Sequence, residues 1–295
     1  MFGLVLLFFV SGLSGCCAGF AVRRFLPRDP AGAATRAIGG RLRRRKTASF
    51  IRDRLEPAKA TGLALTVAVV CLTVVGTLVG VLAFLVRTQT GFVTGDERVA
   101  AWAGAHATVA STQALRLITQ LGSTVTVVVL AIVVSCLELR RARSAVVPAF
   151  LALVGIGQAV IVDLIKFGVD RARPEVASVA FGPGALFSGA SFPSGHSAAA
   201  AAYYASFALI AARGRPAHVR ATLDGVAVAI AVAVATSRVL LRAHWLSDVV
   251  AGLAIGWGWF VLCAVAFGGR MLLFGAPVDM TTHMPTPSGR LDQHA

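Results

Sequence analysis

The sequence contains few charged residues, and acidic residues are especially scarce. Only 14% of its 295 residues are charged, and 28 Lys and Arg residues stand against 13 Asp and Glu residues, whereas 57% of the residues are hydrophobic. A soluble globule cannot bury that much apolar surface, but a lipid bilayer solvates it. The composition therefore excludes a soluble domain and predicts an integral membrane protein.

Cysteine is also scarce, and its five positions form no recognisable site. They lie inside or beside apolar runs, at Cys16, Cys17, Cys71, Cys136 and Cys263. No pair has the spacing of a metal site, and none forms a convincing disulfide pattern, so these residues are best interpreted as small core side chains. The cysteines therefore give no evidence for a zinc site or a disulfide framework.

Long apolar runs occupy most of the chain. The first covers residues 1–22 and is followed by a basic stretch, and six more occupy residues 62–86, 121–137, 145–165, 197–212, 221–237 and 247–267. Each has about the length needed to span a bilayer as a helix. Residues 225–235 alternate with a period of two, but an isolated strand cannot lie in lipid, so a helix is expected there too.

These runs predict an all-α integral membrane fold with a six-transmembrane-helix core bundle and an extra N-terminal apolar helix. The predicted parts are an N-terminal helix over residues 1–22, a basic cytoplasmic linker over 23–60, a six-helix domain over 61–268 and a flexible C-terminal tail over 269–295. Whether residues 1–22 fully span the membrane, or are processed, is left open.

The basic residues predict the orientation of the helices. With residues 23–60 in the cytoplasm, 20 of the 28 Lys and Arg residues fall on the inside, including those at 140–143 and 213–220. This agrees with the positive-inside rule. The basic residues lie in short loops and in the linker, which favours contact with anionic lipid and excludes a nucleic-acid-binding surface.

Residues 94–118 lie between the first two core runs and are expected outside. The segment Thr94-Gly-Asp-Glu97 has the form of a capping box, and the following stretch is rich in alanine. An interfacial helix on the membrane surface is therefore expected.

Three polar clusters interrupt the apolar runs, and the predicted topology places all three on the outer face. They are Lys166-Phe-Gly-Val-Asp-Arg-Ala-Arg173-Pro174, then Ser191-Phe-Pro-Ser194-Gly195-His196, and finally Ser237-Arg238-Val-Leu-Leu-Arg-Ala-His244-Trp-Leu-Ser-Asp248. Ionisable groups close to lipid are usually functional. Their shared face predicts one site.

The first chemistry these clusters suggest is phosphate binding. Lys166, Arg173 and Arg238 supply three cations, and guanidinium groups bind phosphate oxygens in a bidentate manner. Ser194 and Gly195 precede a helix start, where backbone N–H groups and the helix dipole favour an anion. Together these residues predict a phosphate-binding site.

Two histidines and a carboxylate complete the pattern. His244 and Asp248 are four residues apart, so they share one face of a helical turn. Asp248 can accept a hydrogen bond from one ring nitrogen and leave the other as a nucleophile. His196 is then available as the general acid that protonates the leaving oxygen.

The three motifs, Lys-x6-Arg-Pro, Pro-Ser-Gly-His and Ser-Arg-x5-His-x3-Asp, resemble the signature of the type 2 phosphatidic acid phosphatase superfamily. The resemblance implies a six-helix phosphatase in which His244 is the nucleophile, Asp248 orients it and His196 is the acid. It implies that Lys166, Arg173, Ser194, Gly195 and Arg238 bind phosphate, without a metal or other cofactor. Vanadium haloperoxidases share this signature, but they are soluble.

The resemblance further implies a lipid phosphate substrate and a multi-pass protein of a bacterial cell membrane, with its active site on the extracytoplasmic face. Undecaprenyl diphosphate is the first substrate expected, and phosphatidylglycerophosphate, phosphatidate or another polyprenyl phosphate are alternatives. A non-catalytic lipid-phosphate binding or transport protein is the alternative from another class. The sequence leaves the oligomeric state open.

Several nearby residues admit a plainer interpretation. Arg171 and Arg242 could contact a substrate headgroup or anchor the chain at the interface. Gly252 and Gly256 form a Gly-x3-Gly pattern that is typical of helix packing.

Overall fold

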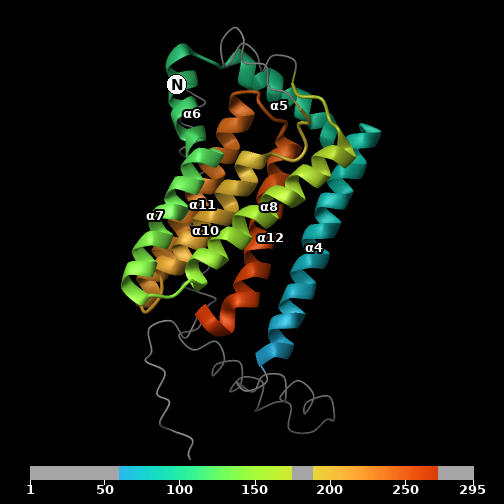
Figure 1. Cartoon of the computed structure of the whole chain (residues 1–295). Coiled ribbons are helices and arrows are strands. Elements are labelled where there is room, and N and C mark those ends of the chain that lie inside the picture. The colour runs from blue at the N-terminus through green and yellow to red at the C-terminus, as the bar shows by residue number, and fades with distance from the viewer. Residues whose placement is uncertain (1–59, 175–188, 272–295) are drawn as a thin grey trace, which may run out of the picture.

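The computed structural model describes residues 60–174 and 189–271, and within these ranges every regular element is helical (Figure 1). The elements are α4 (Ala60–Thr88), the 3-10 helix η2 (Gly91–Val93), α5 (Thr94–Ala105), α6 (Val109–Gln120), α7 (Thr124–Ala142), α8 (Val146–Val169), α10 (Gly195–Ala211), α11 (Ala217–Leu240) and α12 (Leu246–Met271). The predicted all-α class is confirmed.

Each of the six predicted apolar core runs is a helix in the structure. The runs correspond in chain order to α4, α7, α8, α10, α11 and α12. The period-two stretch at 225–235 lies inside α11, as expected. A helix that is apolar on most sides needs no amphipathic period, so alternation of small and branched residues carries no strand signal there.

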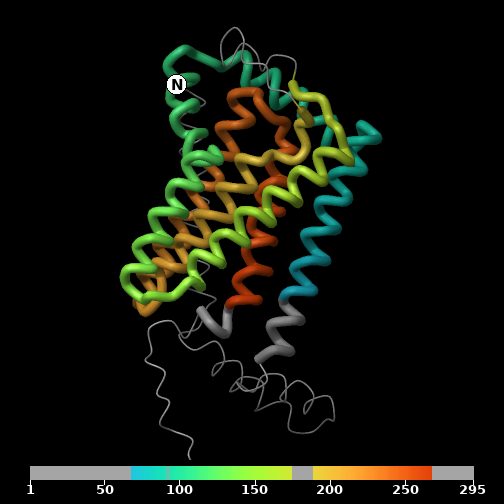
Figure 2. Tube along the Cα trace, in the orientation of Figure 1, coloured from blue at the N-terminus to red at the C-terminus, as the bar shows by residue number. Residues whose placement is uncertain are grey.

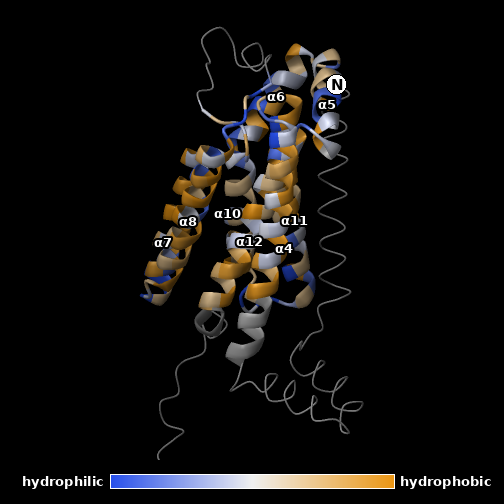
Figure 3. Ribbon diagram, turned by 90° about the vertical axis from the view of Figure 1, so that its right-hand side faces the viewer, coloured by the Kyte–Doolittle hydropathy of each residue, from blue (hydrophilic) through white to orange (hydrophobic). Residues whose placement is uncertain are grey.

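The chain is a multi-pass membrane protein. Within residues 60–174 and 189–271, four helices, α4, α8, α11 and α12, are long and apolar enough to cross a membrane. A fifth span results if α6 and α7, which bend by 41° at their junction, are counted as one. Large apolar side chains such as Leu72, Phe84 and Leu164 are exposed, as lipid-facing residues are. Hydrophobic residues predominate along the helices of the bundle (Figure 3).

The predicted number of six spanning helices remains a prediction. Helix α10 has only 17 residues, at the short end of the length needed to span a bilayer. The predicted N-terminal helix over residues 1–22 lies outside the described residues. So do nearly all of the linker over 23–60 and most of the tail over 269–295.

Helix α10 lies in the middle of the bundle, in contact with α7, α8, α11 and α12. Its alanine-rich surface is largely buried and allows the neighbouring helices to approach closely. A Cβ atom at Gly252 would lie 2.5 Å from the Ser194 carbonyl oxygen, and one at Gly256 would lie 2.3 Å from that of Ala198. The Gly-x3-Gly pattern is therefore a packing surface of α12 against α10.

The segment expected to form one interfacial helix forms two, α5 and α6. The predicted capping box at Thr94–Glu97 is wrong: the residue before α5, Val93, is already helical because η2 leads directly into α5. The Thr94 hydroxyl instead donates to the Gly91 carbonyl. A capping box does occur at the start of α6, between Thr108 and Ser111.

The two ends of the bundle contain different loops and polar residues. At one end, an ion pair of 2.8 Å between Arg213 and Glu138 joins the end of α10 to α7, so the two short basic loops predicted to be cytoplasmic lie together. At the other end lie α5, the end of α8, the start of α10 and the turn between α11 and α12 (Figures 1 and 2). The three polar clusters thus share one end of the bundle.

Candidate active site

The site forms where three chain segments meet. These are the end of α8 with residues 170–174, the residues leading into α10, and the turn from α11 to α12. Backbone bonds join them: the Ser191 N–H donates to the Arg171 carbonyl at 2.7 Å, and the Ser194 N–H donates to the Asp248 carbonyl at 3.0 Å. The three sequence clusters are therefore brought into direct contact.

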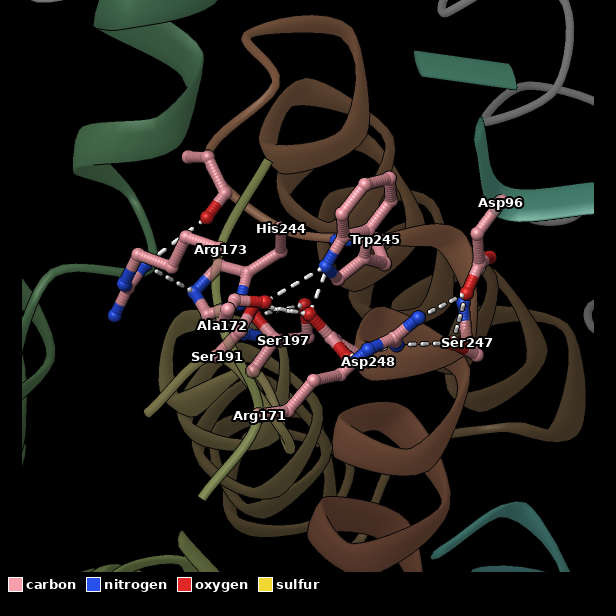
Figure 4. Close-up of polar contacts among 12 residues, drawn as sticks. Asp96, Arg171, Ala172, Arg173, Ser191, Ser197, His244, Trp245, Ser247 and Asp248 are labelled. Carbon is pink, nitrogen blue, oxygen red and sulfur yellow. Dashed lines mark hydrogen bonds and ion pairs between the residues drawn. The ribbon is translucent and has the colours of Figure 1, made fainter. Parts of the chain in front are cut away.

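Asp248 is at the centre of the site and is completely buried. Its Oδ2 atom accepts hydrogen bonds from the Ser191 hydroxyl and from the Trp245 N–H, and it lies 3.4 Å from His244 Nδ1 (Figure 4). Ser191 Oγ is itself 3.4 Å from the same ring nitrogen. The predicted His244–Asp248 pair is present, and Ser191 lies beside both members.

The geometry assigns different surroundings to the two ring nitrogens of His244. Nδ1 faces the carboxylate, whereas Nε2 lies 3.3 Å from Nη1 of Arg173. A proton on Nδ1 therefore leaves the Nε2 lone pair directed toward a cation. Burial lowers the pKa of His244 to about 4, although the hydrogen bond with Asp248 opposes this shift. The imidazole is thus neutral at neutral pH.

Three predicted phosphate ligands gather next to His244. Arg173 is held by the carbonyl oxygens of Gly189 and Ala243, at 3.2 and 3.0 Å, and burial lowers the pKa of its guanidinium. The charges of Arg173 and Arg238 both act on Lys166. Three partly or fully buried cations that repel one another form a site that an anion would stabilise.

Arg238 and Lys166 are placed by different helices. Arg238 is buried near the end of α11, and its Nη1 atom lies 3.4 Å from the hydroxyl of Thr119 on α6. The Lys166 ammonium on α8 lies close to the start of α10, because a Cβ atom at Gly195 would be 3.9 Å from Nζ. The absence of a side chain at Gly195 keeps the helix start open toward this cation.

Ser194 is engaged with its own surroundings. Its backbone N–H donates to the Asp248 carbonyl oxygen. Its hydroxyl oxygen accepts hydrogen bonds from the backbone N–H and the hydroxyl of Ser197, so Ser194 caps the start of α10. A phosphate contact of Ser194 therefore stays a prediction. His196, the second residue of α10, is partly buried and is influenced by the charges of Arg238, Lys166 and Arg173, which places it at the same cluster.

Arg171 corrects an expectation drawn from the sequence. Headgroup contact and interfacial anchoring were the two expected roles, but only 9% of the residue is exposed and its guanidinium points inward. Nη1 donates to Asp248 Oδ1 at 2.7 Å and Nη2 donates to Asp96 Oδ2 at 2.8 Å (Figure 4). Both contacts are buried ion pairs.

Sequence reasoning missed four residues at this site: Asp96, Thr119, Ser191 and Ser247. Asp96 comes from α5 and is buried, and its carboxylate accepts from the Ser247 N–H at 3.1 Å and from the Ser247 hydroxyl. Ser191 belongs to the second cluster, so its position in the motif was a usable signal. Asp96 carried no such signal, because it is distant in sequence from every motif.

The region that contains the site is similar to known proteins. Residues 145–272 match the PAP2 superfamily, and they include the three motif clusters. The chain is similar to the lipid A 1-phosphatases of Rhizobium etli and Rhizobium johnstonii, with 36% identity over 140 residues in each case. That alignment covers 44% of the chain and 55% and 52% of these relatives, so the chain spans about half of their length.

The structure is also similar to a crystal structure of a transmembrane PAP2-type phosphatidylglycerolphosphate phosphatase from Bacillus subtilis. The TM-score is 0.60 at 25% sequence identity, and the match covers 67% of this chain and 96% of that one. The similarity therefore includes nearly the whole of the Bacillus protein.

Proposed function

We propose that the chain, in which residues 145–272 match the PAP2 superfamily, is a membrane phosphatase that hydrolyses a lipid phosphate or diphosphate on the extracytoplasmic face. One observation carries this proposal. A buried, neutral His244 is held between the Asp248 carboxylate and the Arg173 guanidinium, with two further cations nearby. This is the arrangement that a nucleophilic histidine beside a bound phosphate requires.

The first step is phosphoryl transfer to His244. Its Nε2 lone pair forms a bond to phosphorus while the bond from phosphorus to the leaving oxygen breaks. His196 supplies the proton that the leaving oxygen takes up, because the negative charge of the bound phosphate offsets the burial and the neighbouring cations that lower the pKa of this imidazole to about 3 in the free protein. The imidazole gains positive charge in this step, and the Asp248 carboxylate at Nδ1 stabilises it.

The second step regenerates the enzyme. A water molecule attacks the phosphohistidine, its proton passes to His196, and the bond between phosphorus and Nε2 breaks to release inorganic phosphate. Lys166, Arg173 and Arg238 stabilise the equatorial oxygens in both steps, because charge accumulates there in the transition state. These side-chain cations supply the positive charge that the transferred group needs.

The substrate class follows from the position of the site. It lies at one end of a lipid-embedded bundle, where the phosphate of an amphiphile can enter while its hydrocarbon remains in the membrane. An apolar groove of about 500 Å³ between α5, α11 and α12 lies beside the catalytic turn, and its lining includes Leu246 and Val249, which flank the buried Ser247 and Asp248. Such a groove suits a hydrocarbon chain.

Within this class, undecaprenyl diphosphate is the first candidate, from the resemblance of the motifs. The relatives add two others by their names: a lipid A 1-phosphate and phosphatidylglycerophosphate. Phosphatidate and other polyprenyl phosphates complete the set. All carry a phosphate at the end of a long-chain amphiphile.

The test is phosphate release by the detergent-purified full chain with each of these lipids. We expect His244→Ala to lower the rate by at least about 10³-fold, because it removes the nucleophile. His218→Ala is the matched control, since His218 is exposed near the start of α11 at the opposite end. Turnover that persists in His244→Ala would refute the mechanism, and binding without hydrolysis by the wild type would indicate a lipid-phosphate binding protein.

A further inference from the structure

The buried Asp96 carboxylate comes from α5, outside the three motifs, and reaches the catalytic turn through Arg171 and Ser247. Asp96 belongs to α5, whereas Ser247 and Asp248 belong to the first turn of α12. We infer that Asp96 and Arg171 are positioning residues that orient the Asp248 carboxylate toward His244. This inference rests on the proposed function, since it concerns how the proposed nucleophile is held.

The contacts of Arg171 give the first argument. Its two terminal nitrogens divide between two carboxylates, with Nη1 on Asp248 Oδ1 and Nη2 on Asp96 Oδ2. Nη1 also donates to Ser247 Oγ at 2.7 Å. The planar guanidinium is rigid, so anchoring Nη2 on Asp96 determines where Nη1 lies. Asp96 therefore sets the direction from which Asp248 is held.

The contacts of Asp248 give the second argument. Arg171 occupies Oδ1, while Ser191 and the Trp245 N–H occupy Oδ2, the oxygen that faces His244. The carboxylate is thus held from both sides. A rotation caused by losing the Arg171 contact would move Oδ2 relative to Nδ1. Small misplacements of catalytic groups cost large factors in rate.

Charge gives the third argument. Arg171 shares its positive charge between two buried carboxylates, so Asp248 is not fully neutralised by it. If Asp96 were neutral, the whole charge of Arg171 would act on Asp248. That carboxylate would then stabilise less well the positive charge that develops on His244 during transfer. A neutral residue 96 is therefore expected to slow the chemical step.

The test compares isosteric and charge-preserving variants of the full chain. Asp96→Asn is expected to lower kcat by about 10- to 100-fold with little change in KM, because the three phosphate-binding cations keep their contacts. Arg171→Lys keeps the charge, but an ammonium cannot span both carboxylates in this geometry, so a similar loss is expected. This second variant carries the test if Asp96→Asn fails to fold.

Glu138→Gln is the matched control. It removes one partner of the Arg213–Glu138 pair, which is also 2.8 Å long but lies at the opposite end of the bundle. If Asp96 had a purely structural role, Asp96→Asn would behave like Glu138→Gln. Each variant would lose thermal stability, and kcat of the folded protein would stay unchanged in each. We expect kcat to fall only in Asp96→Asn, and an unchanged kcat there would overturn the inference.

A second readout does not depend on lipid hydrolysis. Diethyl pyrocarbonate modifies neutral imidazoles, and mass spectrometry of the peptide that contains His244 reports its rate of modification. His244 is only 3% exposed, so a loosened catalytic turn should raise this rate, by at least about threefold in Asp96→Asn and not in Glu138→Gln. An unchanged rate would count against the inference. If the wild type hydrolysed no lipid, the proposed function would fail, yet this rate would still decide the positioning role.

Discussion

Burial and the Asp248 carboxylate act in opposite directions on the pKa of His244. Removal from water disfavours the imidazolium, and the nearby Arg238 and Arg173 disfavour it further, whereas Asp248 favours it. The first effect is larger, so the pKa is lowered to about 4. The role proposed for His244 requires an unprotonated ring nitrogen, and the lowered pKa keeps one ring nitrogen unprotonated. The Asp248 carboxylate lies beside Nδ1, where it can stabilise the positive charge that forms on the ring.

This pKa predicts the pH dependence of the first chemical step. His244 loses its lone pair only as the pH falls through about 4, so its contribution to kcat/KM should stay constant from pH 7 down to about 5. Stopped-flow or quench measurement of phosphoryl transfer over this range checks the prediction. An inflection of kcat/KM near pH 6.5 that arises from titration of His244 would contradict the prediction.

The same shift predicts a pH-dependent stability. The unfolded chain binds a proton at His244 near pH 6.5 and the folded chain does not, so this contribution is lost as the pH falls from 6.5 to 4. The loss is about 3 kcal/mol for a shift of this size. Wild type should therefore lose more stability than His244→Asn between pH 7 and 4.5, as measured by thermal unfolding in detergent.

Among the helices, the contact between α10 and α12 matters most for the site. Gly252 and Gly256 allow α12 to lie against the backbone at the start of α10, and this brings the Asp248 carbonyl to the Ser194 N–H. Helix packing and site geometry are therefore coupled. A change in the distance between these two helices would move Asp248 away from the residues that lead into α10.

Gly256→Ala tests this coupling. Its Cβ atom would lie 2.3 Å from the Ala198 carbonyl oxygen, which is backbone and cannot rotate away, so we expect a destabilisation of about 1–3 kcal/mol and reduced activity. Gly80→Ala is the control, because a Cβ atom at that position in α4 meets nothing within 4 Å. It should be neutral or slightly stabilising. Equal thermal stability of Gly256→Ala and Gly80→Ala would show that the contact between α12 and α10 at Gly256 can accommodate a methyl group.

Over the whole molecule, the basic loops between helices gather at the end of the bundle opposite the candidate site. The end with Arg213 and the basic turn after α7 matches the cytoplasmic side predicted from the positive-inside rule. The opposite end contains the candidate site. The positive-inside rule therefore predicts that the candidate site faces the outside.

A pair of cysteine substitutions tests this orientation. In a background without the five native cysteines, Ala107→Cys, between α5 and α6, should react with a membrane-impermeant maleimide on intact cells. Ala145→Cys, between α7 and α8, should react only after permeabilisation. Both alanines are exposed in the structure. The opposite labelling pattern would reverse the predicted topology and the side on which substrate is hydrolysed.

Features that depend on local pattern could be predicted from the amino-acid sequence. Apolar runs long enough to span a bilayer identified the core helices, because length and hydropathy are properties of one segment. The alternation of chain direction then placed the three motif clusters at one end. The spacing of His244 and Asp248 placed both on one face of a turn, and the structure brings them to 3.4 Å.

The contacts between distant segments could be learned only from the folded protein. The partners of Arg171 include Asp96, which is 75 residues away, and Ser247 meets Asp96 across 151 residues. Neither residue type nor spacing indicates such a pairing. It arises because α5 packs against α11 and α12, and a carboxylate buried there must find a cation and N–H or O–H donors.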